Sequence, residues 1–430
     1  MLVDANHGEL INAKATLIEC ENETYPNGVP PSRRSQYGLD WFCFFLSDVR
    51  NGVDSFLAAY LTGIGWGPQR IGFALSAATF STLLAQIPIG ALVDSVRHKQ
   101  VLMAVGVLTI PIAAVIFAFR PQFWFVVLGE VMLGIAEPLF TPSISAIGLG
   151  LVGQHFLGRR VGRNQSFGAA GNVVSAIAMG LLGYYVSIQS IFFFVISCSV
   201  PALVALSCIR RREINYEQSR AAVQVDGEMS VVGFLDLLRQ IFRDRRLLIF
   251  FSCVILFHFG NGSMLPTMVQ LMARNRSPGA SSVFMSACVG VTQLVSTALS
   301  AWVGRQADIW GRKPLLLIGW AAVPLRGLVC VLTRNPIALI AAELFDGIAA
   351  ATYGVVIVLV VADLARGTGR FNLMLGALGV ATGLGYTLSN SVTGTIVEHY
   401  GFSCGFMTLS TIGTISFLLL RIAMPETLEA

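Results

Sequence analysis

Charged residues are scarce in this sequence. Asp, Glu, Lys and Arg together make up 12% of its 430 residues, whereas apolar residues make up 54% and the mean hydropathy is +0.70. A soluble protein has too little interior to hide so much apolar surface from water. The composition therefore excludes a soluble globular protein and indicates a chain that lies in a membrane.

Several chemical signatures are also missing from the sequence. The eight cysteines show no C-x-x-C spacing and mostly lie in apolar stretches, which argues against a disulfide framework or a metal site. There is no G-x-x-x-x-G-K-[ST] sequence for ATP phosphates, and no H-E-x-x-H or G-x-S-x-G sequence of a hydrolase. We therefore expect no enzymatic activity, no cofactor, no metal and no nucleic-acid partner.

Long apolar runs are what the sequence does contain. A membrane-spanning helix needs about 20 mostly apolar residues. Twelve segments qualify, and we predict an all-α membrane protein from them. Their approximate limits are 41–64, 70–93, 100–119, 123–150, 166–186, 190–209, 247–272, 282–303, 314–333, 337–363, 373–396 and 402–422.

The polar segments divide these spans into two groups of six. Residues 1–38 carry three prolines and lack the apolar core of a signal peptide, so we predict a cytosolic tail. The predicted order is this tail, a six-helix half over 39–209, a cytosolic linker over 210–246, a second six-helix half over 247–424, and a short cytosolic tail over 425–430. By our tally the loops on one side hold 18 Lys and Arg and those on the other hold five. Because basic residues accumulate in the cytosol, both termini are predicted to lie there.

Three pairs of segments repeat between the two halves. Gly90 to Lys99 matches Gly304 to Lys313 at an offset of 214 residues. The segment beginning at Gly129 matches the one beginning at Ala342 at an offset of 213, and Leu46 to Gly52 matches Leu256 to Gly262 at an offset of 210. Near-equal offsets in the same order are typical of a transporter built from two related halves.

The segment from Gly304 to Lys313 resembles the G-x-x-x-D-x-x-G-R-K signature of the major facilitator superfamily. The resemblance implies a bacterial secondary transporter with twelve helices, and it implies a monomer. In that family the signature is associated with a charge latch between the halves, for which Asp363 is a predicted partner of Arg312 or Lys313. The residues assigned to this latch are Gly90, Asp94, Arg97, Gly304, Asp308, Gly311, Arg312, Lys313 and Asp363. The alternative is that they are only basic loop residues beside a turn.

Ionisable residues inside predicted spans are the candidates for binding solute and protons, because such residues are costly in a membrane. In the first span, Arg50 and Asp54 share a helix face, and Asp48 corresponds to His258 through the repeat. The pair Asp48 and His258 is the first candidate for proton coupling. Asp48 could instead only cap or pair locally, and His258 could be a packing residue.

The fourth and tenth spans add matched acids. Glu137 and Asp346 are predicted to lie nearest mid-membrane, while Glu130 and Glu343 could be structural counter-charges, and Arg326 could neutralise one acid of the tenth span. The full predicted cavity set is Asp48, Arg50, Asn51, Asp54, Glu130, Glu137, His258, Asn261, Arg326, Glu343 and Asp346. Glu130 stands where many drug/proton antiporters of the superfamily carry arginine, which argues against a multidrug pump.

Together these patterns predict a secondary active transporter of a bacterial inner membrane that works by alternating access. A small organic solute and protons are its expected partners, within a lipid bilayer. Acids and aromatics in the cavity favour proton-coupled efflux of an amphipathic or cationic solute. The arginines leave open proton-coupled uptake of an organic acid or a siderophore-like iron chelate. A sensor with the same fold that does not transport is a further alternative.

Overall fold

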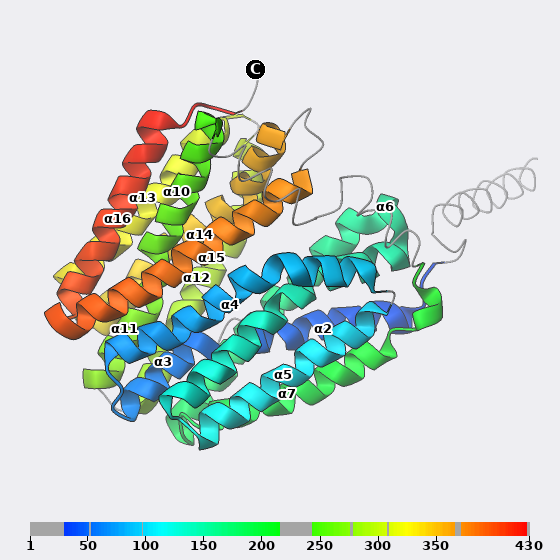
Figure 1. Ribbon diagram of the computed structural model, residues 1–430, viewed down its shortest axis with the longest axis horizontal. Coiled ribbons are helices and arrows are strands. Elements are labelled where there is room, and N and C mark those ends of the chain that lie inside the picture. The colour runs from blue at the N-terminus through cyan, green and yellow to red at the C-terminus, as the bar shows by residue number, and fades with distance from the viewer. Residues whose placement is uncertain are drawn as a thin grey trace, which may run out of the picture.

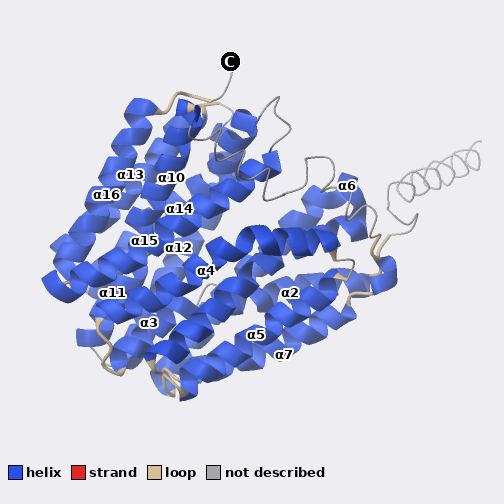
Figure 2. Ribbon diagram, in the orientation of Figure 1, coloured by secondary structure: helices blue, strands red, loops and turns tan. Residues whose placement is uncertain are grey.

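The protein is described here from a computed structural model, which covers residues 30–50, 53–96, 98–215, 243–275, 278–307, 309–365 and 371–427. Throughout this described part the regular structure is helical, and no strand is present (Figure 2). The all-helical fold agrees with the prediction from the apolar runs.

The helices form two bundles, one from each half of the sequence (Figure 1). The first contains α2 (Arg33–Arg50), α3 (Val53–Gly63), α4 (Pro68–Ser95), α5 (Lys99–Phe119), α6 (Phe123–Tyr185) and α7 (Ser190–Cys208), and it is followed by the short helix η1 (Arg211–Glu213). The second contains α10 (Arg245–Gly262), α11 (Met264–Asn275), α12 (Pro278–Ala307), α13 (Arg312–Leu332), α14 (Pro336–Ala365), α15 (Phe371–Tyr400) and α16 (Phe402–Ala423). The bounds agree with the predicted spans to within about four residues, except at the start of α2 and where helices break or merge.

Nine helical segments of the described part are long and apolar enough to cross a membrane. They are Lys99–Phe119, Phe123–Gly153, Arg159–Tyr185, Ser190–Cys208, Arg245–Arg274, Gly279–Ala307, Arg312–Leu332, Pro336–Leu364 and Phe402–Ala423. The other three predicted spans, 41–64, 70–93 and 373–396, correspond to α2 with α3, to α4 and to α15.

Helix α6 unites the predicted fourth and fifth spans. Its backbone is non-helical at Gly153, where φ is +73°, so two membrane-length helices meet there at a kink. A side chain is strained in this left-handed region, which explains why glycine occupies the turn. The predicted seventh span is broken as well, at Ser263 between α10 and α11.

The start of α2 lies earlier than predicted. Residues 33–38, expected in the polar tail, are helical because Ser32 caps the helix: its Oγ accepts a hydrogen bond from the Ser35 amide at 3.3 Å. Glu213 accepts a second bond from the Ser32 amide at 3.0 Å. Burial raises the pKa of Glu213, but hydrogen bonds from Ser35 and Ser32 and the charge of Arg210 outweigh it and hold the pKa below its usual value. This region therefore holds the linker end of α7 against the start of α2.

The two bundles contact each other mainly at one end of the molecule. We call this the closed end; it contains the ends of α3 and α11, the start of α4 and the end of α15. The contacting pairs are α4 with α15, α6 with α12, and α3 with α11. At the opposite, open end, which contains the starts of α2 and α13, the bundles diverge (Figure 1).

Small residues make the close approach at the closed end possible. A Cβ added at Gly72 of α4 would lie 2.3 Å from the Asn390 carbonyl oxygen of α15, and one at Gly394 would lie 2.7 Å from the Pro68 carbonyl oxygen. Small residues let membrane helices pack backbone against backbone. Hydroxyls complete the α4–α15 contact: Ser391 donates to Ser76 at 2.6 Å.

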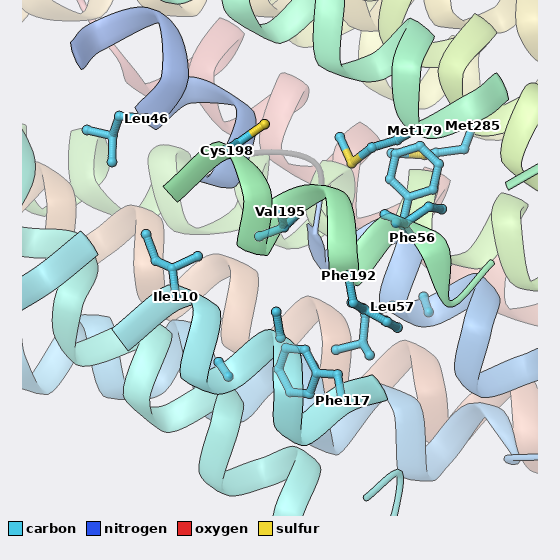
Figure 3. Close-up of a cluster of buried hydrophobic side chains, with 14 of the residues drawn as sticks. Leu46, Phe56, Leu57, Ile110, Phe117, Met179, Phe192, Val195, Cys198 and Met285 are labelled. Atoms are coloured by element: carbon cyan, nitrogen blue, oxygen red, sulfur yellow. The ribbon is translucent and has the colours of Figure 1, made fainter. Parts of the chain in front are cut away.

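One hydrophobic core cluster extends across the closed end from the first bundle into the second. It contains Phe56 and Met179 of the first bundle and Met285 of α12, which Figure 3 shows in one group. A second cluster lies within the second bundle. The shared cluster explains why the bundles are joined at this end.

Candidate transport site

A cavity of about 280 Å³ lies between the two bundles. Helices α2, α3 and α6 supply one wall, and α11, α12, α14 and α15 supply the other. The lining residues are Ser47, Phe56, Asn172, Ser175, Ala176, Met179, Leu265, Val289, Thr292, Gln293, Asp346 and Tyr386. Apolar walls with a few convergent polar groups are typical of a binding site for a small molecule.

The charged wall of the cavity is built around Arg326 of α13. Its Nη2 lies 2.7 Å from Glu343 Oε1, and its Nη1 lies 2.8 Å from Asp346 Oδ1. The side chains of Arg326 and Glu343 are 1% and 0% exposed, whereas Asp346 is 17% exposed and lines the cavity. Two carboxylates share one guanidinium, so the cluster carries surplus negative charge, and Asp346 is the member that a solute can reach.

Two polar side chains hold Asp346 in place. Asn261 of α10 donates to Asp346 Oδ1 at 2.9 Å and accepts from Arg326 at 2.9 Å. Thr292 of α12 donates to Glu343 Oε2 at 3.0 Å and lies 3.4 Å from Asp346 Oδ2. Four helices thus meet at this cluster, and the hydrogen bonds compensate part of the cost of removing its charges from water.

Glu137, the predicted acid of the first bundle, is not among the residues that line the cavity. Glu137 of α6 is half-buried and accepts a hydrogen bond from Thr82 of α4 at 3.2 Å. Tyr386 of α15 lines the cavity, as Asp346 does.

His258 of α10 lies behind Tyr386 in an aromatic shell. Its ring centroid is 5.0 Å from that of Tyr386 and 4.6 Å from that of Tyr353, and the residue is 5% exposed. Neither ring nitrogen has a hydrogen-bond partner within the part of the chain that the structure describes. His258 therefore does not line the cavity, but its ring contacts Tyr386, which does.

The candidate residues of the first span fall mostly outside the described part of the chain. Asn51 lies outside the described residues, and so do the side chains of Asp48, Arg50 and Asp54. Since α2 begins at Arg33 and α3 ends at Gly63, the backbone of Asp48 lies about halfway along this span. Glu130 of the fourth span is fully buried in α6 and does not line the cavity.

Two residues assigned to the predicted latch form an ion pair at the open end. Arg312 Nε lies 3.2 Å from Asp363 Oδ2, and both groups belong to the second bundle. Glu426, from the segment after α16, accepts hydrogen bonds from the Arg312 and Lys313 amides at 2.9 and 3.0 Å.

The glycines of the latch have different surroundings. Gly311 has φ of +91° and lies against Glu426, so a side chain there would be strained and obstructed. Gly304 and Gly90 lie within α12 and α4. Asp308 and Arg97 lie outside the described residues, as does the side chain of Asp94.

Sequence reasoning missed a second buried ion cluster, at the open end of the first bundle. Asp40 of α2 is fully buried and pairs with Arg160, and its Oδ2 accepts from Arg163 Nε at 2.8 Å. Asn164 accepts a hydrogen bond from Arg160 Nε at 2.9 Å. The signal in the sequence was one acid directly before the first predicted span and a group of arginines after the fourth, but only the fold brings them together.

Comparison with known proteins identifies the family. The sequence matches the Major Facilitator Superfamily over residues 41–303 and 250–429. It is 36% identical over 404 residues to an uncharacterized MFS-type transporter of Mycobacterium tuberculosis (strain H37Rv), covering 94% of this chain and 95% of that protein. A shorter match, 30% identical over 146 residues, covers 32% of this chain and 24% of the efflux pump dotC of Dothistroma septosporum.

The fold agrees with this result. The crystal structure of a mutant of the nucleoside transporter NupG superposes with a TM-score of 0.75 at 14% identity, covering 91% of this chain and all of that one. Two helical bundles around a central cavity define a multi-pass membrane transporter. The chain belongs to the major facilitator superfamily, and it is a secondary transporter and not an enzyme.

Proposed function

We propose that this transporter exports a small, positively charged organic solute from the cytosol in exchange for protons, across a bacterial cytoplasmic membrane. The main support for this proposal is the position of Asp346. Its side chain lines the cavity and shares the guanidinium of Arg326 with Glu343. The surplus carboxylate can bind either a proton or a cationic group. Competition between the two for one carboxylate produces exchange in opposite directions.

The cavity size supports a small solute. Its volume of about 280 Å³ lies just below the range of about 300–1,000 Å³ typical of sites for drug-sized molecules. Asn172 and Gln293 offer polar groups from the two walls, and Phe56 and Tyr386 border the cavity with aromatic rings. The resemblance of one segment to a fungal efflux pump supports the direction.

The orientation follows from the basic residues. Exposed arginines gather at the open end, among them Arg34, Arg159 and Arg211. Because positive residues stay in the cytosol, the open end is assigned to the cytosol and the structure to the inward-facing state. In this state a cytosolic solute displaces the proton from Asp346, and the halves then rock to open the other end. Asp48 and His258 are proposed to relay protons to or from this site.

Solute-driven proton release tests the proposal. Purified protein in weakly buffered detergent is titrated with small organic ammonium ions, then reconstituted in liposomes with an imposed pH gradient. We expect ammonium solutes to release protons and to move against the proton flow. Asp346→Asn should abolish both effects, and Asp48→Asn and His258→Ala should weaken coupling. Asp244→Asn, at an exposed acid directly before α10, should change neither.

Three results would contradict the proposal. Solute movement that is indifferent to the pH gradient would indicate a uniporter or another coupling ion. Carboxylate solutes that move together with protons would establish uptake by symport instead. Proton release that persists in Asp346→Asn would remove Asp346 from the site.

A further inference from the structure

At the open end of the first bundle, α2 and the second part of α6 display arginines and aromatic rings in the same order. On α2 the residues Arg34, Tyr37 and Trp41 follow at spacings of three and four, so they share one face. On α6, Arg159, Arg163 and Phe167 follow at spacings of four.

Side-chain contacts join the two faces into one surface. The Arg163 guanidinium lies 5.6 Å from the Tyr37 ring centroid and 5.8 Å from that of Phe167. The Trp41 ring lies 6.0 Å from Phe167 and 5.3 Å from Phe44, edge to face in both cases. We call Arg34, Tyr37, Trp41, Arg159, Arg163 and Phe167 the α2–α6 surface.

This surface is exposed although it is rich in aromatic side chains. Tyr37 is 50% exposed and Trp41 is 46% exposed. It lies on the flank of α6 that is opposite to the cavity, since the cavity-lining Asn172 and Ala176 occupy another face of that helix. Exposed aromatic rings at the end of a membrane helix are typical of the boundary between lipid and water.

The surface also carries unbalanced positive charge. Exposed arginines lie on α2, on α6 and directly after α7, where the Arg210 amide bonds to Ser35 Oγ at 3.0 Å. The acids of these described segments at this end are engaged: Asp40 pairs with Arg160 and Arg163, and Glu213 with Arg210. The exposed arginines are Arg33, Arg34, Arg159, Arg163, Arg210, Arg211 and Arg212.

We infer that the α2–α6 surface is a binding site for an anionic phospholipid of the cytosolic leaflet. The arginines lie nearer the helix start and the rings lie deeper: Arg34 and Trp41 are seven residues apart, or about 10 Å along the helix. A phosphate at the level of the arginines places its acyl chains along the rings. A free phosphate ion has no group to match the rings, so the order of residues favours a lipid.

The inference depends on the proposed orientation of the open end and not on the proposed solute. Its test uses the fluorescence of Trp41, because bromine on lipid acyl chains quenches tryptophan on contact. The full-length protein has six tryptophans, so the difference between wild type and Trp41→Phe isolates the signal of Trp41. The probes are brominated phosphatidylglycerol and brominated phosphatidylcholine in mixed detergent micelles.

We expect phosphatidylglycerol to quench Trp41 at a lower mole fraction than phosphatidylcholine. Arg34→Gln combined with Arg159→Gln should reduce this preference on the order of tenfold, because each arginine near a membrane surface favours anionic lipid. Arg70→Gln combined with Arg120→Gln, two exposed arginines at the closed end, is the matched control and should retain it.

Equal quenching of wild-type Trp41 by the two lipids would overturn the inference. So would an unchanged preference in the Arg34 and Arg159 double variant. Added inorganic phosphate distinguishes the ligand source: if it removes the quenching by phosphatidylglycerol at matched ionic strength, the surface binds soluble anions and not lipid.

Discussion

At the scale of single residues, the chemistry of the cavity depends on one arginine and the two acids that share it. Arg326 is buried and makes ion pairs with Glu343 and Asp346, and Asn261 binds both Arg326 and Asp346. Removing one partner from such a cluster is costly because a charge then remains buried without compensation. Arg326 and Asn261, which hold Asp346 from behind, do not themselves line the cavity.

Substitution of Arg326 measures how much the stability of the protein depends on this ion cluster. We expect Arg326→Leu to destabilise the protein by about 3–5 kcal/mol, since it leaves Glu343 buried without its ion pair. The double variant Arg326→Leu/Glu343→Leu should recover part of the loss. The measurement is the unfolding midpoint in denaturant in a constant detergent. Arg421→Leu, an exposed arginine of α16, is the control, and an equally small effect at both positions would contradict the prediction.

At this scale the sequence singled out the charged residues of this cluster and predicted that Arg326 could neutralise one of its acids, but it did not reveal every hydrogen-bonding partner. Intramembrane charge alone drew attention to Arg326, Glu343 and Asp346. Thr292 was missed because a single threonine in an apolar helix carries no such signal; only the packing of α12 on α14 brings it to the acids. His258 was singled out as a cavity residue, yet its position behind Tyr386 depends on the packing of three helices.

At the scale of elements, the contact between α4 and α15 determines how the halves can move. Gly72 and Gly394 let the backbones touch, and hydroxyls such as Ser76 and Thr387 bond both to their own helix and to the other. When the helices separate, each hydroxyl keeps the hydrogen bond to its own helix. The contact can therefore open without leaving these hydroxyls unsatisfied.

Adding one methyl group at this contact should disturb the closed end. An alanine Cβ at Gly72 would lie 2.3 Å from the Asn390 carbonyl oxygen, and a backbone atom yields only if a helix moves. We expect Gly72→Ala to lengthen the distance between spin labels at Ile64 and Tyr400, two exposed residues of the closed end, and to slow transport. Gly162→Ala, a helical position with open space, should leave both unchanged. Identical label distances in the two variants would show that the contact is not tight.

Helices were predictable because apolar length and polar loops specify them directly. Segments such as 314–333 and 402–422 agree with α13 and α16 to within about two residues. The start of α2 was predicted too late because capping by Ser32 and Glu213 involves a contact far away in sequence. The break at Ser263 was not predicted either, and Ser263 bonds to Ser389 of α15, which no local pattern reveals.

At the scale of the whole molecule, the two bundles touch at the closed end and diverge at the open end. This arrangement is one of the two states that a transport cycle needs. Alternating access requires that the closed end open when the open end closes. The internal repeat in the sequence predicted two related halves, but it carries no information on which state the molecule adopts. That choice depends on contacts between halves, such as the core shared by Phe56, Met179 and Met285.

A disulfide across the halves should trap this state. Ser76 Oγ and Ser391 Oγ lie 2.6 Å apart, so cysteines at the two positions can bond with little movement. In a background free of the native cysteines, we expect Ser76→Cys/Ser391→Cys to lose transport on oxidation and to regain it with a reductant. Each single variant serves as the control. Full transport by the oxidised double variant would mean that α4 and α15 do not separate in the cycle.

The position of the Arg326 cluster in the sequence also affects how the chain is inserted into the membrane during synthesis. Arg326 and its two acids lie on consecutive helices, α13 and α14, which are joined by only the residues 333–335. A lone arginine or glutamate at the centre of a nascent helix opposes its transfer into lipid. Because both helices leave the ribosome together, arginine and acids can neutralise each other within one hairpin. The most costly charges of the cavity can thus enter the bilayer as a pair during synthesis, before the last two helices exist.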